Sequence, residues 1–183
     1  MKKFLSRPEV ALALTVIFVA ASILLNTRFR FGPECEAVSE QFYRSSSGSS
    51  IATELRNLCN ASEKIVFLAS SQGIENTGDA MEEIDEIRDF LRTGSNDFEE
   101  IFSSYESLLK ETFELESVLS RMQISSTDGE ELSAAQHAAA EAKKAIDNSE
   151  YNEVVRSFQR QYKHFPTTFL ASLAGVRIPS FFA

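Results

Sequence analysis

Few residues in this chain have the type and spacing that catalysis or metal binding requires. Neither Cys35 nor Cys59 has a second cysteine or a histidine at metal-ligand spacing, and there is no cluster of cysteines and histidines elsewhere. The sequence also has no glycine-rich phosphate loop and no nucleophile motif. These observations predict a protein that is not an enzyme and that binds no metal or cofactor.

The two cysteines allow a second kind of chemistry. Cys35 and Cys59 flank the serine-rich stretch Ser45–Ser50 almost symmetrically. If this stretch is a turn, the flanking helices run antiparallel and a disulfide between Cys35 and Cys59 becomes feasible, which would place the body outside the cytoplasm. If it is only a kink, the cysteines lie far apart on one long helix. They are otherwise small buried hydrophobic residues.

A group of acidic residues could attract divalent cations. It lacks the alternating oxygen ligands and the glycine of an EF-hand, so we interpret it as a solvated helix face. Its members are Glu82, Glu83, Asp85, Glu86 and Asp89.

Val10–Leu25 is an uncharged run that organises the rest of the chain. Extended to Pro8 and Thr27 it has roughly 20 residues, interrupted only by Glu9, enough to cross a hydrocarbon core of about 30 Å as a helix. Basic residues flank it on both sides: Lys2, Lys3 and Arg7 before, Arg28 and Arg30 after. The sequence therefore predicts a single-pass anchor, carried by Val10, Leu14, Ile17, Phe18, Ile23 and Leu25.

A cleaved signal peptide is the alternative to an anchor. The small residues Ala20, Ala21 and Ser22 lie inside the run, so cleavage there would leave an apolar new terminus. This favours an uncleaved anchor. Three basic residues before the run and two after it favour a cytoplasmic N-terminus and a body outside the cytoplasm.

The remaining chain is strongly acidic. Of the 27 acidic residues 26 follow residue 30, against 13 of the 18 basic ones, which gives this part a net charge of −13. Such a surface repels phosphates, so we expect no nucleic-acid partner. Glycine and proline are few and no window alternates apolar with polar residues, so the sequence predicts an all-α body.

We expect a membrane anchor over residues 1–30, an antiparallel four-helix-type bundle over 31–165 and a tail over 166–183. Apolar residues at three- and four-residue spacing, in places heptad-like as in a coiled coil, mark the helices. The chain should leave the membrane through Gly32-Pro33 and begin a helix at Glu34. The further helices are expected at Ile51–Gln72, Ala80–Arg92, Asp97–Met122 and Glu130–His164.

The tail differs in charge from the middle of the chain. After residue 150 there is one acidic residue, Glu153, against four basic ones. Pro166 should end the last helix, because its ring removes a donor and restricts Phe165. The aromatic and basic segment that follows suits either docking on the bundle or a position in the lipid headgroup region.

The same C-terminal segment resembles the signature of the LemA family of bacterial membrane-anchored helical proteins. A Tyr-Asn pair precedes Val, Arg and Phe at helical spacing, then a Phe-Pro break and a run of Leu, Ala and Gly. The matching residues are Tyr151, Asn152, Val155, Arg156, Phe158, Phe165, Pro166, Leu170 and Gly175. The match covers about 33 positions. The first helix departs from the family, with the serine-rich stretch and an acidic, proline-free Ile51–Gln72 where relatives carry a long basic helix.

The resemblance implies a bacterial inner-membrane protein whose bundle has a non-enzymatic scaffold or interaction role with unidentified protein partners. Two alternatives remain open: an accessory subunit of a membrane protease or envelope complex, and an extracytoplasmic ligand-sensing bundle. Against a sensor, no signalling domain or second membrane helix follows in the sequence. The sequence also leaves open whether the protein forms a homo-oligomer.

Overall fold

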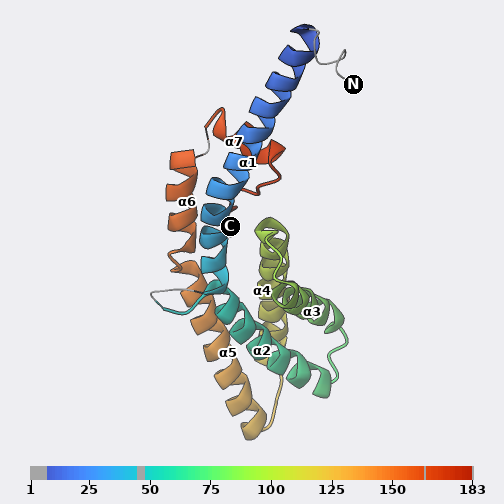
Figure 1. Ribbon diagram of the computed structural model, residues 1–183. Helices are drawn as coiled ribbons and strands as arrows, with labels where there is room; N and C mark the ends of the chain where they lie inside the picture. The colour runs from blue at the N-terminus through green and yellow to red at the C-terminus, as the bar shows by residue number, and fades with distance from the viewer. Residues whose placement is uncertain (1–7, 45–47, 163, 183) are drawn as a thin grey trace. The chain divides into compact units, whose positions relative to one another are not determined.

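The computed structural model describes residues 8–44, 48–162 and 164–182, and within them every regular element is an α-helix (Figure 1). This confirms the all-α prediction. The helices are α1 (Pro8–Tyr43), α2 (Ile51–Ser71), α3 (Gly78–Thr93), α4 (Phe98–Leu119), α5 (Ser126–Asp147), α6 (Tyr151–Tyr162) and α7 (Thr167–Leu173).

The chain forms two compact units that interleave along the sequence. One unit combines the described residues up to Ser39 with Val155–Pro179. The other combines Glu40–Val154 with the residues from Ser180 onward. We call them the anchor unit and the bundle unit. Helices α1 and α6 each contribute residues to both.

Helix α1 does not break where the sequence predicted. It runs for 36 residues without interruption through Gly32 and Pro33, so the expected exit loop and new start at Glu34 are wrong. A proline inside a helix removes one hydrogen bond and costs about 3 kcal/mol. Buried side chains on one face offset this cost over the following turns: Phe31, Cys35, Val38 and Phe42.

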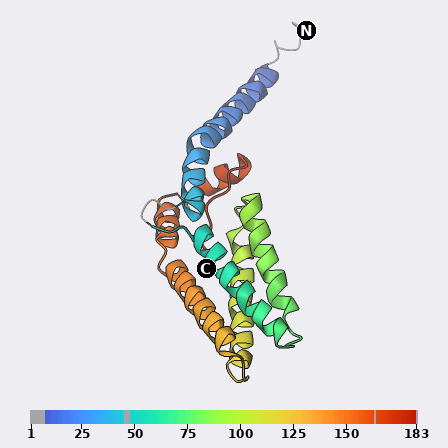
Figure 2. The same ribbon diagram turned by 90° about the horizontal axis from the view of Figure 1, so that it is seen from below.

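Within the bundle unit, α2 packs against α3, α4 and α5 (Figures 1 and 2). Helix α5 runs antiparallel to α2, since Gln72 near the end of α2 bonds Asp128 near the start of α5. Helices α3 and α4 form an antiparallel hairpin. Gly94 caps α3 in the left-handed conformation (φ 67°), which glycine adopts without strain.

The start of α2 follows ordinary capping chemistry. The Ser50 hydroxyl accepts a hydrogen bond from the Thr53 backbone N–H and satisfies one of the unpaired donors of the first turn. Since α1 ends at Tyr43 and α2 begins at Ile51, the serine-rich stretch separates two helices. Its residues 45–47 lie outside the described residues.

The single helix expected over Glu130–His164 is two helices. Helix α5 ends at Asp147 and α6 begins at Tyr151. The Asn148 side chain donates to the Lys144 carbonyl, and the Ser149 hydroxyl accepts from the Tyr151 N–H. Such side-chain bonds to the backbone compete with the helical ladder and end it.

The anchor unit contains the first part of α1, most of α6 and α7, and α7 lies beside α1 in both views (Figures 1 and 2). Aromatic rings hold it together: Phe31 of α1 stacks on Phe158 at 5.6 Å between centroids and meets Tyr162 edge-on at 5.1 Å. Beyond α7, Gly32 faces Val176, such that a methyl group at Gly32 would lie 3.9 Å from Val176 Cγ2.

Candidate functional site

The start of α6 fixes the C-terminal residues of the chain. The Asn152 side chain accepts a hydrogen bond from the Phe182 N–H (2.9 Å) and donates one to the Phe182 carbonyl (2.8 Å). The Tyr151 hydroxyl donates to the Ser180 carbonyl at 2.9 Å. Adjacent side chains of one helix turn thus bind the backbone of Ser180 and Phe182, and we call this arrangement the C-terminal clamp.

The clamp places the Phe182 ring in an aromatic cluster of the bundle unit. Phe182 is 3% exposed and lies 5.4 Å from Phe42 and 5.1 Å from Phe102 between ring centroids. Burial raises the pKa of the Tyr151 hydroxyl far above its usual range, so this group stays protonated and keeps its donor role. The cluster comprises Phe42, Tyr43, Phe90, Phe98, Phe102, Tyr105, Tyr151 and Phe182.

The other residues of the predicted signature on α6 differ in their solvent exposure. Val155 is fully buried and Phe158 is buried against Phe31, whereas Arg156 is exposed. Gln159, which the sequence analysis did not single out, donates to the Pro179 carbonyl at 2.8 Å. Polar residues at the start and middle of α6 therefore hold the same returning segment at successive points.

The last part of the signature forms α7 and its flanks. Phe165 precedes Pro166 across a cis peptide bond and is 84% exposed. Leu170 is half-buried on α7, and Gly175 ends the element with φ 68°, in the left-handed region that favours glycine. Ala171 is the buried residue of this helix.

The predicted anchor residues lie on the first part of α1 with their side chains outward. Ile17 and Phe18 are 62% and 73% exposed, and the most apolar window of α1 is unburied throughout. Its mean hydropathy is 2.3, so α1 is long and apolar enough to cross a membrane. The remaining predicted residues are Val10 (half-buried), Leu14, Ile23 and Leu25 (exposed).

Both cysteines are free thiols in the structure and both are buried, Cys35 in the anchor unit and Cys59 in the bundle unit. Burial raises the pKa of Cys35 to about 11 and that of Cys59 to about 12. At neutral pH neither forms the reactive thiolate to a useful extent. Both side chains are buried, as expected of small hydrophobic residues, and the Cys35–Cys59 disulfide stays a prediction.

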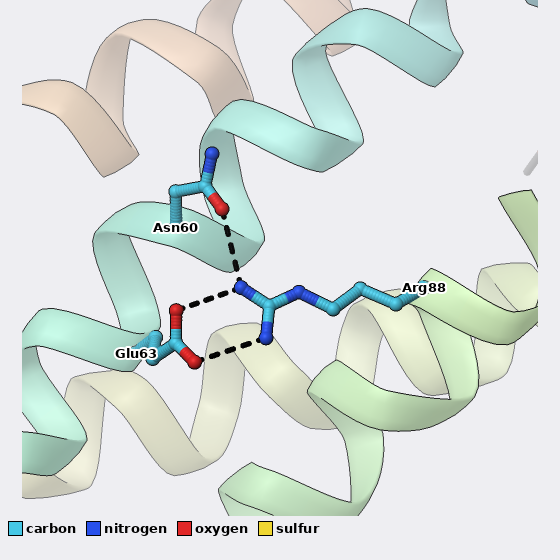
Figure 3. Close-up of polar contacts among 3 residues, drawn as sticks. All are labelled: Asn60, Glu63 and Arg88. Atoms are coloured by element: carbon cyan, nitrogen blue, oxygen red, sulfur yellow. Dashed lines mark hydrogen bonds and ion pairs between the residues drawn. The ribbon is translucent and has the colours of Figure 1, made fainter.

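A polar cluster that the sequence analysis did not find joins α2 to α3. Arg88 donates to both carboxylate oxygens of Glu63, at 3.0 and 2.7 Å, and to the Asn60 side-chain oxygen at 3.2 Å (Figure 3). This bond to Arg88 lowers the pKa of Glu63. The partners come from different helices, so sequence spacing gives no signal for them.

The Arg88 cluster forms one wall of a shallow recess of about 250 Å³. Its lining residues are Arg56, Asn60, Arg88, Leu91 and Arg92. Arg88 is paired with Glu63 and Arg92 with Asp89. Because two of its three guanidinium groups face carboxylates, the recess is mainly a cross-helix ion-pair cluster and not a strongly positive anion site.

The alanine-rich face of α5 packs on α2. Ala135, Ala139 and Ala142 are buried, whereas Ala138 and Ala145 remain exposed at the edge of a groove between the two helices. His137 is exposed on α5 and lies 3.5 Å from Glu141 one turn away. Of the acidic group, Glu82, Asp85, Glu86 and Asp89 are exposed, whereas Glu83 is half-buried. Among the described residues, no three histidine, cysteine, aspartate or glutamate side chains lie together as metal ligands would.

No protein-family model, curated protein or solved structure matches the chain significantly.

Proposed function

We propose that this protein is a membrane-tethered helical bundle of LemA type, with a scaffold or interaction role and no catalytic activity. One observation carries the proposal: α1 is a single helix whose first part exposes its apolar side chains and whose later turns bury theirs in folded structure. A water-soluble helix would not present an apolar surface on all sides. The continuity of α1 supports a helix that remains in the mature protein.

Membrane extraction tests the tether. We expect the wild-type chain to stay in the membrane pellet in alkaline carbonate, with an intact mass that includes the N-terminus. An I17R/A21R variant should become soluble, because each arginine at the middle of a spanning helix costs about 2.5–3.5 kcal/mol. A variant with two arginines on the bundle, F67R/F113R, is the matched control, since Phe67 and Phe113 are 73% and 70% exposed.

The control variant should remain in the pellet. Extraction of the wild-type chain by carbonate, or a mass that lacks the residues before Ser22, would contradict the tether.

We further propose that the membrane is the bacterial inner membrane and that the N-terminus faces the cytoplasm, which places the body outside. The support is the excess of basic residues before the apolar run. Because Cys35 and Cys59 are buried with raised pKa values, a cysteine introduced at the exposed Ser103 would report sidedness without interference. S103C should react with a membrane-impermeant maleimide in intact spheroplasts. Reaction only after lysis would show that the body faces the cytoplasm and would contradict the proposed orientation.

A variant of the C-terminal clamp can serve as the control in a search for protein partners. Affinity purification from native membranes compares the wild-type chain with N152A, in which the C-terminal residues lose their anchoring bonds. Proteins retained by the wild type alone are candidate partners. A single stoichiometric partner would favour an accessory subunit of a larger membrane complex over a general scaffold.

A further inference from the structure

We propose that α7 makes a second contact with the bilayer, in which its apolar face lies in the headgroup region beside the anchor. The inference rests on the proposed tether. The contact surface consists of Phe165, Phe169 and Leu173, and we call it the α7 surface.

The α7 surface is apolar and unpartnered. Phe165, Phe169 and Leu173 are 84%, 56% and 57% exposed, whereas Ala171 between them is buried. Phe169 and Leu173 are four residues apart on α7 and so share one face. Phe165 precedes the helix, and its ring lies 6.5 Å from that of Phe169 between centroids, which joins it to the same surface. Two phenylalanines and a leucine grouped in this way mark an interaction surface more than ordinary scattered surface residues do.

The position of α7 along α1 points to the membrane surface. Val176, three residues after α7, faces Gly32 of α1. Gly32 follows the last residue of the apolar run, Leu25, by seven positions, or about 10 Å of helix. Residues 8–27 fill a hydrocarbon core of about 30 Å as a helix, so Gly32 lies about 7.5 Å beyond the core, at the outer part of a headgroup layer that is about 5–7.5 Å thick on each side.

The charge of this segment fits anionic headgroups. From residue 155 to 179 the sequence contains no acidic residue, whereas it contains Arg156, Arg160 and Arg177. Arg28 and Arg30 lie on α1 just before Gly32. The acidic residues of the anchor unit are Glu9, Glu34 and Glu36, so basic residues predominate here while the bundle unit is acidic. A basic segment with aromatic residues is the usual composition of interfacial membrane elements.

The absence of tryptophan from the sequence makes a direct test feasible. Three full-length variants each carry one tryptophan: F169W on the α7 surface, F18W in the anchor and F113W on the exposed face of α4. Each is reconstituted in vesicles that contain anionic phosphatidylglycerol and phosphatidylcholine brominated either near the glycerol or near the end of the acyl chain. Bromine quenches tryptophan only at short range, so the pattern reports depth.

We expect F169W to lose most of its emission with shallow bromine and little with deep bromine. F18W should be quenched by deep bromine, and F113W by neither. Quenching of F18W with F169W behaving like F113W would overturn the α7 contact and leave the tether intact, and a blue-shifted but unquenched F169W would assign the surface to a protein neighbour instead. If F18W is not quenched either, the tether fails and this inference fails with it.

Discussion

At the scale of single residues, polar side chains of α6 hold the C-terminal segment. Asn152 makes two hydrogen bonds to one residue, Phe182, whose ring is buried among other aromatic rings. Glu63 and Glu83 show the opposite effects of environment on a carboxyl group. Pairing with Arg88 lowers the pKa of Glu63, and burial raises the pKa of Glu83.

Replacement of Asn152 by alanine should lower the free energy of unfolding of the bundle by about 1–3 kcal/mol, because the two hydrogen bonds between the Asn152 side chain and the Phe182 backbone are lost. F182A should cost about 3 kcal/mol through the cavity it leaves among the aromatic rings. Urea unfolding in detergent followed by circular dichroism measures both, with the exposed R156A as control. The double variant should lose less than the sum, since either change releases the same segment. Full additivity would show that Asn152 and Phe182 act independently.

The two glutamates predict opposite changes in stability at neutral pH. A lowered pKa means that ionised Glu63 stabilises the fold above its usual pKa and that this contribution is lost as the pH falls through the folded-state value. E63Q should therefore lower the stability at pH 7 by less than about 1 kcal/mol, since the pair is partly exposed, and the difference should close in acid.

For Glu83 the sign reverses, because a raised pKa means that ionisation opposes folding above its usual pKa. E83Q should raise the melting temperature at neutral pH, and its advantage should disappear as the pH falls below the usual glutamate pKa. Melting curves of the wild type and both variants from neutral to acidic pH check the pair. Curves that shift in the same direction at neutral pH would contradict this assignment.

At the scale of elements, the small side chains of α5 set its distance from α2. Ala142 is 1% exposed and lines the groove edge with Ala61 of α2, whereas Ala140 points outward. Small residues on a contact face let two helices approach closely. A buried hydrogen bond from the Thr112 hydroxyl to the Ser62 hydroxyl joins α4 to the same central helix.

Replacement of Ala142 by leucine should destabilise the bundle by about 1–3 kcal/mol, because the added carbons have no space between α2 and α5. The matched control is A140L, the same chemical change on the exposed face of the same helix, which should stay within about 0.5 kcal/mol of the wild type. Unfolding free energies of the two variants check this. Equal effects would mean that the α2 and α5 contact is looser than the structure shows.

At the scale of the whole molecule, charge is separated along the chain. Residues 75–131 contain 17 acidic and 4 basic residues, and the ion pairs among the described residues are few and mostly exposed. We therefore expect repulsion among these acids to oppose folding more than the ion pairs support it. Of the 14 remaining basic residues, nine lie in residues 1–30 and 151–183.

Added salt should therefore stabilise the protein. Raising sodium chloride from low concentration to well above physiological ionic strength shortens the screening length to a few ångströms, and we expect the melting temperature to rise by a few degrees. The variant R88Q, which loses the Glu63 pair, should gain at least as much as the wild type. A lower melting temperature in salt would show that ion pairs outweigh the repulsion.

The sequence determined the properties that depend on local pattern: the apolar run of α1, the all-α class and the amphipathic α2, α3 and α4, because helical periodicity and low glycine content are local. It also pointed to Tyr151 and Asn152 without saying what they do. The continuity of α1 through Pro33 and the break at Asn148 were missed, since buried packing and side-chain bonds to the backbone outweighed residue propensity there.

Tertiary structure alone decided the pairings between residues far apart in sequence. The bonds from Asn152 to Phe182 and from Arg88 to Glu63 join segments about 25 to 30 residues apart, and no spacing rule selects such partners. Tertiary structure also decided which side chains are exposed: Cys35 and Cys59 are buried, whereas Phe165, Phe169 and Leu173 face solvent. The physical reason is that exposure and cross-helix contact depend on which faces meet, and that is fixed only when the whole core packs.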